Sequence, residues 1–111
     1  MEKLGDMIQV KAVIGERDIC LLFIKTESCG VCDAVLVQTE ELLEQFPKLE
    51  GVLVSMKEVP EISAEYLVFT APTLLVFVQG KEVMRESRFI VFEKFEYNLR
   101  RWYEAVTEDR A

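Results

Sequence analysis

The sequence predicts an α/β fold in which a mixed, four-stranded sheet is covered by helices on both faces. An apolar run at 19–24, a segment of helical periodicity at 31–46 and a second apolar run at 51–56 follow one another. This alternation predicts two parallel strands joined by a crossover helix. A third apolar run at 73–78 is followed by a turn and a further strand at 81–89, which predicts an antiparallel hairpin.

The first element is expected to be an amphipathic helix from Leu4 to Ile14. Asp6 is a candidate N-cap, and Gly15 is placed to end the helix. A strand is the alternative, because residues 7–14 are rich in Ile and Val. The run from Ile19 to Ile24 is almost continuously apolar, as expected for a central strand that is covered on both faces.

The second helix is predicted over Val31–Phe46, where apolar residues recur at helical spacing until Pro47 ends the helix. Gly51–Met56 is interpreted as the next buried strand. A short helix is expected to begin at Pro60 and to run to about Val68, because Pro is well suited to a first helical turn.

The remaining elements form a hairpin and a C-terminal helix. Thr73–Val78 and Lys81–Phe89 are the two strands of the hairpin, and Gln79-Gly80 is its turn. The charges of the second strand are those expected on an exposed sheet edge. The final helix, Phe92–Val106, is expected to bury one face, made of Phe92, Phe95, Leu99, Trp102, Tyr103 and Val106.

Length and composition narrow the classes of function. The chain has 111 residues, which predicts a single domain over 1–111. Its net charge is −7, and its Lys and Arg residues form no cluster larger than Arg100-Arg101, so we expect no nucleic-acid partner. The longest apolar run has six residues and the N-terminus lacks the apolar stretch of a signal peptide, so we expect no membrane and a cytoplasmic protein.

The strongest chemical signal is the sequence Cys29-Gly30-Val31-Cys32, between a predicted strand and a predicted helix. A helix N-terminus favours a thiolate, and a second cysteine three residues later can close a disulfide with it. Glu27 is expected to oppose the thiolate, with Lys25 as a candidate to offset it. The chain has no His, which excludes Cys–His catalysis within one chain and His-based metal sites. Cys20 is expected to be a small core residue.

Several landmarks together resemble the thioredoxin family. Besides Cys29-Gly30-Val31-Cys32, Ala71-Pro72-Thr73 directly precedes the third strong strand, 40 residues after Cys32, and Gly80 follows eight residues after Pro72. The match extends from Leu4 to Val106. The resemblance implies a thioredoxin-like α/β fold in which Pro72 is cis and lies beside the cysteine pair.

The resemblance also implies roles for individual residues. Cys29 is the nucleophile that attacks a disulfide, and Cys32 is the thiol that resolves the mixed disulfide. A substrate docks against five residues, with its backbone paired to that of Ala71: Ser28, Gly30, Val31, Ala71 and Pro72. No metal and no dissociable cofactor are required.

The chain departs from the family pattern at several positions. Ser28 replaces a Trp, Val31 a Pro and Ala71 an Ile or Thr, which implies a smaller and less aromatic docking patch. Phe23 stands where the family has a buried Asp that assists proton transfer, and Leu53 stands where it has a Lys. A Gly of the last strand falls on Arg88.

The sequence therefore predicts a thiol–disulfide oxidoreductase that reduces or exchanges the disulfides of proteins or the disulfides formed by small thiols. A reductase or a low-molecular-weight thiol would recharge the cysteine pair. The alternative from another class is a thioredoxin-like binding module whose cysteines sense redox state or are idle. A further alternative is a metal site shared by the cysteine loops of two chains, because one chain alone supplies too few ligands for zinc.

Overall fold

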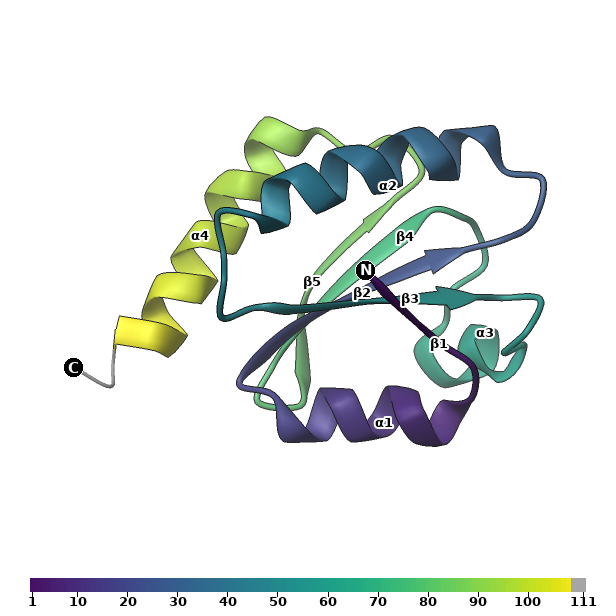
Figure 1. The fold of residues 1–111 in the computed structure, drawn as a ribbon, viewed down its shortest axis with the longest axis horizontal. Coiled ribbons are helices and arrows are strands. Elements are labelled where there is room, and N and C mark those ends of the chain that lie inside the picture. Colours follow the sequence, from purple (N-terminus) through teal and green to yellow (C-terminus); the bar gives the residue numbers. More distant parts are fainter. Residues whose placement is uncertain (109–111) are drawn as a thin grey trace.

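The computed structural model describes residues 1–108, which form one five-stranded sheet with helices on both of its faces (Figure 1). The strands lie in the order β1-β3-β2-β4-β5. The elements along the chain are β1 (Glu2–Leu4), α1 (Met7–Glu16), β2 (Ile19–Lys25), α2 (Gly30–Leu43), β3 (Glu50–Ser55), α3 (Glu61–Tyr66), β4 (Thr73–Val78), β5 (Lys81–Ser87) and α4 (Phe92–Glu108).

The centre of the sheet has the predicted strand directions. β2 runs parallel to β3, with Leu22 opposite Val52, and antiparallel to β4, with Leu22 opposite Leu75. β4 and β5 form the predicted antiparallel hairpin. Its turn has positive φ at both Gln79 (49°) and Gly80 (82°), the backbone that matches the twist of two hairpin strands.

The prediction of four strands was wrong by one, because Glu2–Leu4 forms a further strand. β1 pairs in parallel with β3, with Lys3 opposite Leu53. Three residues are too few to show a strand periodicity, and the open edge of β3 provides the partner that makes them a strand. The predicted helix at 4–14 is accordingly shorter at its N-terminal end, where α1 begins at Met7 after its N-cap.

The caps of α1 follow the sequence at one end only. Asp6 is the N-cap as predicted, and its carboxylate accepts a hydrogen bond of 2.8 Å from the Gln9 N–H. Gly15 does not end the helix, contrary to the prediction. The helix continues to Glu16 and ends at Arg17, whose backbone is extended and whose N–H still donates to the Val13 carbonyl. An extended C-cap needs no glycine.

The core consists of two apolar layers, one on each face of the sheet. Alternate residues of β2 point to opposite faces. Cys20, Leu22 and Ile24 pack with α1 and α3, and the layer on the other face includes Ile19, Leu21, Phe23 and side chains of α2 and α4. Figure 1 shows α2 and α4 together on one face of the sheet and α1 with α3 on the other.

Some predicted boundaries shift. α2 begins one residue before the predicted Val31 and ends at Leu43. β5 ends at Ser87, two residues before the predicted Phe89, because Arg88 has left-handed backbone (φ 65°). On α4, Phe95, Leu99 and Val106 are buried, but Trp102 is 39 % exposed, so the predicted buried face is narrower than expected. None of the helices in residues 1–108 is long and apolar enough to cross a membrane.

Candidate functional site

The cysteine pair lies between the end of the central strand β2 and the first turn of α2. β2 ends at Lys25, Ser28 turns the chain with positive φ (56°), and α2 begins at Gly30. Cys29 is the N-cap of this helix, and its Sγ accepts a hydrogen bond of 3.1 Å from the Cys32 N–H. Cys29 and Cys32 form a disulfide, with their Cα atoms 5.2 Å apart.

The two sulfurs differ in access. Cys29 is half-buried, whereas Cys32 is only 1 % exposed and lies on the inner side of α2. A molecule in solution can therefore reach the sulfur of Cys29 but not that of Cys32. In the reduced protein, the N-terminal amides and the dipole of α2 would favour negative charge on Cys29, because the first turn of a helix has unpaired N–H donors.

Pro72 lies beside this pair, as expected from the resemblance. The Ala71–Pro72 peptide bond is cis, and the Cys29 Sγ is 4.0 Å from the Ala71 carbonyl oxygen. The pairing of β2 with β4 explains the proximity. Ile24, near the end of β2, is opposite Thr73, the first residue of β4, so the residues after the one strand meet the residues before the other.

A small cleft joins these segments. It has a volume of about 280 Å³ and is lined by Ser28, Cys29, Gly30, Val31, Ala71, Pro72, Arg88 and Phe89. We call it the dithiol cleft. Six of its lining residues are the nucleophile and the five docking residues that the sequence singled out, so the fold brings all of these together; Cys32 lies beneath.

Arg88 and Phe89 are the two residues of the cleft that were not predicted from the sequence. Arg88 was expected to be a charge on the edge strand, and this was wrong because the strand ends before it. The Arg88 N–H donates to the Pro72 carbonyl at 2.7 Å, which fixes this segment against the cis peptide. A signal was present: Arg88 occupies a position at which the family has Gly, and an apolar run, Phe89 to Phe92, follows it directly.

A second, more polar hollow meets the cleft at Ser28, Cys29 and Gly30. Its other lining residues are Lys25, Thr26, Glu27 and Asp33. Glu27, whose charge was expected to oppose the Cys29 thiolate, forms an ion pair with Lys57 at 3.0 Å, and Lys25 lines the same hollow. Both partners are more than half exposed, so solvent screens the pair and it contributes little to stability.

The third cysteine, Cys20, is a free thiol in the interior. Cys20 is fully buried in the layer under α1 and α3, as predicted. Burial, followed by the negative charge of Glu50, raises the pKa of its thiol to about 12, while Arg17 acts in the opposite direction. Phe23 is also fully buried, in the layer under α2 and α4, so this position carries apolar packing instead of the family's carboxylate.

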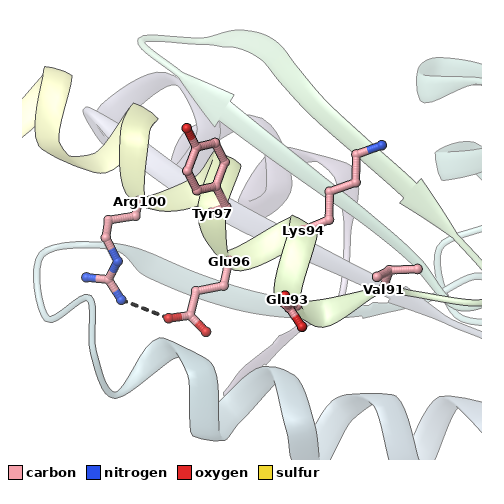
Figure 2. A pocket seen from close by; sticks show the side chains of 6 residues that line it. All are labelled: Val91, Glu93, Lys94, Glu96, Tyr97 and Arg100. Atoms are coloured by element: carbon pink, nitrogen blue, oxygen red, sulfur yellow. Dashed lines mark hydrogen bonds and ion pairs between the residues drawn. The ribbon is translucent and has the colours of Figure 1, made fainter.

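A hollow with a greater volume than the dithiol cleft lies elsewhere, on α4 (Figure 2). It has a volume of about 670 Å³ and is lined by Val91, Glu93, Lys94, Glu96, Tyr97 and Arg100. Arg100 and Glu96 point toward each other and form an ion pair at 3.0 Å. This hollow contains no cysteine, and its side chains come from α4 and the residue just before it. Within residues 1–108, no three metal-ligating side chains lie close enough together to hold an ion.

Comparison with known proteins places this site in a family. The thioredoxin-like protein YdfQ of Bacillus subtilis (strain 168) is 35% identical over 103 residues, which cover 93% of this chain and 92% of that protein. The X-ray structure of Fasciola hepatica thioredoxin superimposes with a TM-score of 0.80 at 25% identity, over 90% of this chain and 98% of that one.

A Plasmodium falciparum thioredoxin structure gives a TM-score of 0.78 at 18% identity, over 95% of this chain and 98% of that one. No family model matches the sequence. The extended similarity to the Bacillus subtilis relative, together with the thioredoxin fold and the CxxC pair at the start of α2, shows that this chain belongs to the thioredoxin family.

Proposed function

We propose that this protein is a thiol–disulfide oxidoreductase that reduces or exchanges disulfides in protein clients and disulfides formed by small thiols. The observation that carries the proposal is the asymmetry of the cysteine pair. Cys29 is the accessible N-cap of α2 and opens onto the dithiol cleft, while Cys32 is buried within disulfide reach behind it. Membership of the thioredoxin family supports the same chemistry.

The proposed reaction begins with the reduced pair. The Cys29 thiolate attacks one sulfur of the client disulfide, forming a mixed disulfide and releasing the other client sulfur as a thiolate, which takes a proton from water. Cys32 then loses its proton and attacks the Cys29 sulfur, which releases the second client thiol and closes the disulfide Cys29–Cys32. The client gains two electrons from the protein and two protons, one from water and one from Cys32.

The dithiol cleft would hold the client during the attack. Ala71 is half-buried beside Cys29, and its backbone offers hydrogen-bonding groups to an extended client segment, a short case of strand addition. Ser28, Gly30, Val31 and Pro72 complete the floor and walls. With small residues in place of large aromatic ones, the cleft suits a client chain that lies close to the backbone.

A partner must return the oxidised pair to the dithiol. We assign this role to a reductase or a low-molecular-weight thiol, and we place the protein in the cytoplasm, where such reductants keep thiols reduced. The chemistry needs no metal and no dissociable cofactor, since both redox equivalents are carried by the sulfurs of Cys29 and Cys32.

Replacement of the nucleophile tests the proposal. Wild-type protein should accelerate the reduction of insulin disulfides by dithiothreitol, and Cys29→Ser should return the rate to that of dithiothreitol alone. Cys20→Val is the matched control, because it removes a thiol that the core shields from any client, and it should retain wild-type acceleration. Equal acceleration by wild type and Cys29→Ser would exclude the proposed role.

The rival function is a non-catalytic binding module, which is favoured by the buried apolar residue at position 23. A Cys32→Ser variant separates the two functions, because it blocks resolution after Cys29 has attacked. An enzyme should accumulate clients as mixed disulfides that dithiothreitol releases, and the double variant Cys29→Ser/Cys32→Ser should lose them. A binding module should retain the same partners in both variants.

A further inference from the structure

We propose that Arg88 makes this protein selective for clients that carry a carboxylate next to the reacting cysteine. Arg88 and Phe89 line the dithiol cleft and come from the segment between β5 and α4, whereas Val31 comes from α2. This inference rests on the proposed function, because it names the class of substrate that the same cleft accepts.

The Arg88 guanidinium has no intramolecular partner within residues 1–108. The other arginines of this part of the chain are engaged. They form ion pairs with acidic side chains or lie over an aromatic ring: Arg17 with Glu50, Arg85 with Glu82, Arg100 with Glu96, and Arg101 over Tyr97. In a chain with 20 acidic and 13 basic residues, an arginine left without an acid is available for one from outside.

The backbone of Arg88 is held in an uncommon conformation beside the dithiol cleft. Its φ is 65°, a region that L-residues other than Asn and Asp visit rarely. The hydrogen bond from its N–H to the Pro72 carbonyl keeps the residue beside Cys29's cleft. Glycine would fit this backbone without strain, so an arginine here needs another reason.

The two hollows that meet at Cys29 differ in the charges of their lining residues. The polar hollow presents Lys25, Glu27 and Asp33, and Glu27 is already paired with Lys57. Among residues 1–108, Arg88 is the only charged residue that lines the dithiol cleft. A client segment that crosses Cys29 therefore meets a net positive charge on the cleft side, where a guanidinium can bind a carboxylate through two parallel hydrogen bonds.

Two apolar side chains complete the recognition surface. Phe89 is 82 % exposed and Val31 is 50 % exposed, and both line the dithiol cleft. Exposed apolar groups gathered around one site mark a binding surface. The occupant is thus an extended client segment with a carboxylate for Arg88 and an apolar side chain that packs on Phe89 and Val31.

Synthetic peptides test this selectivity. Each peptide contains one cysteine capped as its neutral methyl disulfide, a Phe two residues away, and a variable residue that is Glu, Gln or Lys. Two series place the variable residue before or after the cysteine. The reduced protein is mixed with each peptide at low ionic strength, and the rate constant for loss of its thiols is measured by acid quench and mass spectrometry.

In one of the two series, we expect the Glu peptide to react about fivefold faster than the Lys peptide, as for a single partly exposed charge pair. Salt at 0.5 M should reduce this preference, because it screens exposed charges. Arg88→Gln and Arg88→Gly should abolish the preference, and Arg88→Lys should retain part of it. Arg101→Gln changes the net charge equally but lies on α4, and it should retain the wild-type ratio.

Three results would overturn the proposal. They are equal rates for Glu and Lys peptides in both series, an unchanged ratio in Arg88→Gln, and a loss of rate in Arg88→Gln that is the same for all peptides and for iodoacetamide. The last result would make Arg88 an activator of the Cys29 thiolate and not a selector of clients.

Docking without chemistry separates this proposal from the proposed function. The same peptides with Ser in place of the capped cysteine are titrated into the oxidised protein, and the amide signals of Arg88 and Phe89 are followed by NMR. Tighter binding of the Glu peptide than of the Lys peptide supports the role of Arg88 even if no peptide is reduced. Equal binding overturns it even if every peptide is reduced.

Discussion

At the scale of single residues, two positions with unusual backbone lie beside the cysteine pair. Within residues 1–108, four non-glycine residues have positive φ, namely Ser28, Leu67, Gln79 and Arg88. Gln79 serves a hairpin turn and Leu67 ends α3, which are ordinary places for such backbone. Ser28 and Arg88 instead line the dithiol cleft from two directions. Strain of this kind persists where the surrounding structure imposes it and a function retains it.

Replacing Arg88 by glycine should therefore stabilise the protein. The left-handed backbone costs an L-residue roughly 1–2 kcal/mol, and the greater freedom of glycine in the unfolded chain offsets part of the gain. We expect Arg88→Gly to raise the free energy of unfolding by about 0.5–1 kcal/mol in urea titrations. Arg88→Gln, which keeps the strained side chain, should leave it unchanged. A lower stability of the glycine variant would mean that the guanidinium makes a stabilising contact.

At the scale of secondary structure, the strands and helices that frame the site follow from local patterns of the sequence. β2 is apolar throughout because both of its faces are covered, and α2 begins where Cys29 caps it. β1 and the end of β5 depend instead on their neighbours. β1 exists because the edge of β3 pairs with it, and β5 stops at Ser87 because Arg88 turns toward Pro72.

The N-cap of α1 gives a prediction at this scale. The Asp6 carboxylate accepts from the Gln9 N–H, which would otherwise lack a partner at the start of the helix. Asp6→Ala should lower the free energy of unfolding by about 1 kcal/mol. Asp6→Asn keeps an acceptor in the same place and should cost much less. Chemical denaturation of both variants measures the difference, and equal losses would show that the cap does not depend on this hydrogen bond.

At the scale of the whole molecule, one central strand organises both apolar layers and the site. The side chains of β2 alternate between the layer under α1 and α3 and the layer under α2 and α4, and the strand leads directly to Cys29. Burial of this strand keeps Cys20 away from solvent, so of the three cysteines only Cys29 and Cys32 form a disulfide. That residues 1–111 form a single domain stays a prediction.

The buried Cys20 makes stability depend on pH in the alkaline range. Its pKa is raised by burial from 9.0 to about 12, so the folded protein keeps the proton while the unfolded chain releases it above about pH 9. The contribution of the neutral thiol is complete below pH 9 and is lost as pH rises toward 12. Between pH 8 and 10 the loss should be about 1 kcal/mol.

The measurement compares two proteins that lack the reactive pair, so that thiol exchange does not interfere. In a Cys29→Ser/Cys32→Ser background, urea unfolding is followed at pH 8 and pH 10 with Cys20 present and with Cys20→Val. The protein that retains Cys20 should lose about 1 kcal/mol more stability over this range. Parallel losses in the two proteins would show that the thiol is not protonated selectively in the folded state.

The class of fold, the order of helices and strands from Ile19 onward, and the cysteine pair at the start of α2 could all be predicted from the amino-acid sequence. These features follow from local causes: apolar periodicity, turn-forming residues, and a cysteine placed at a helix start. The family resemblance added Pro72 and the docking residues around it. Sequence patterns did not reveal β1, since three residues carry no period, nor the extended C-cap that lets α1 pass Gly15.

The surroundings of Cys29 depend on contacts between segments that are distant in the sequence. The antiparallel pairing of β2 with β4 brings Ala71 and Pro72 to a cysteine more than 40 residues away, and the Arg88 N–H ties a third segment to them. The fold likewise sets the partner of Glu27, because it brings Lys57 within 3.0 Å of this carboxylate. Contacts between distant segments depend on strand register and backbone geometry, and no local pattern of residues encodes them.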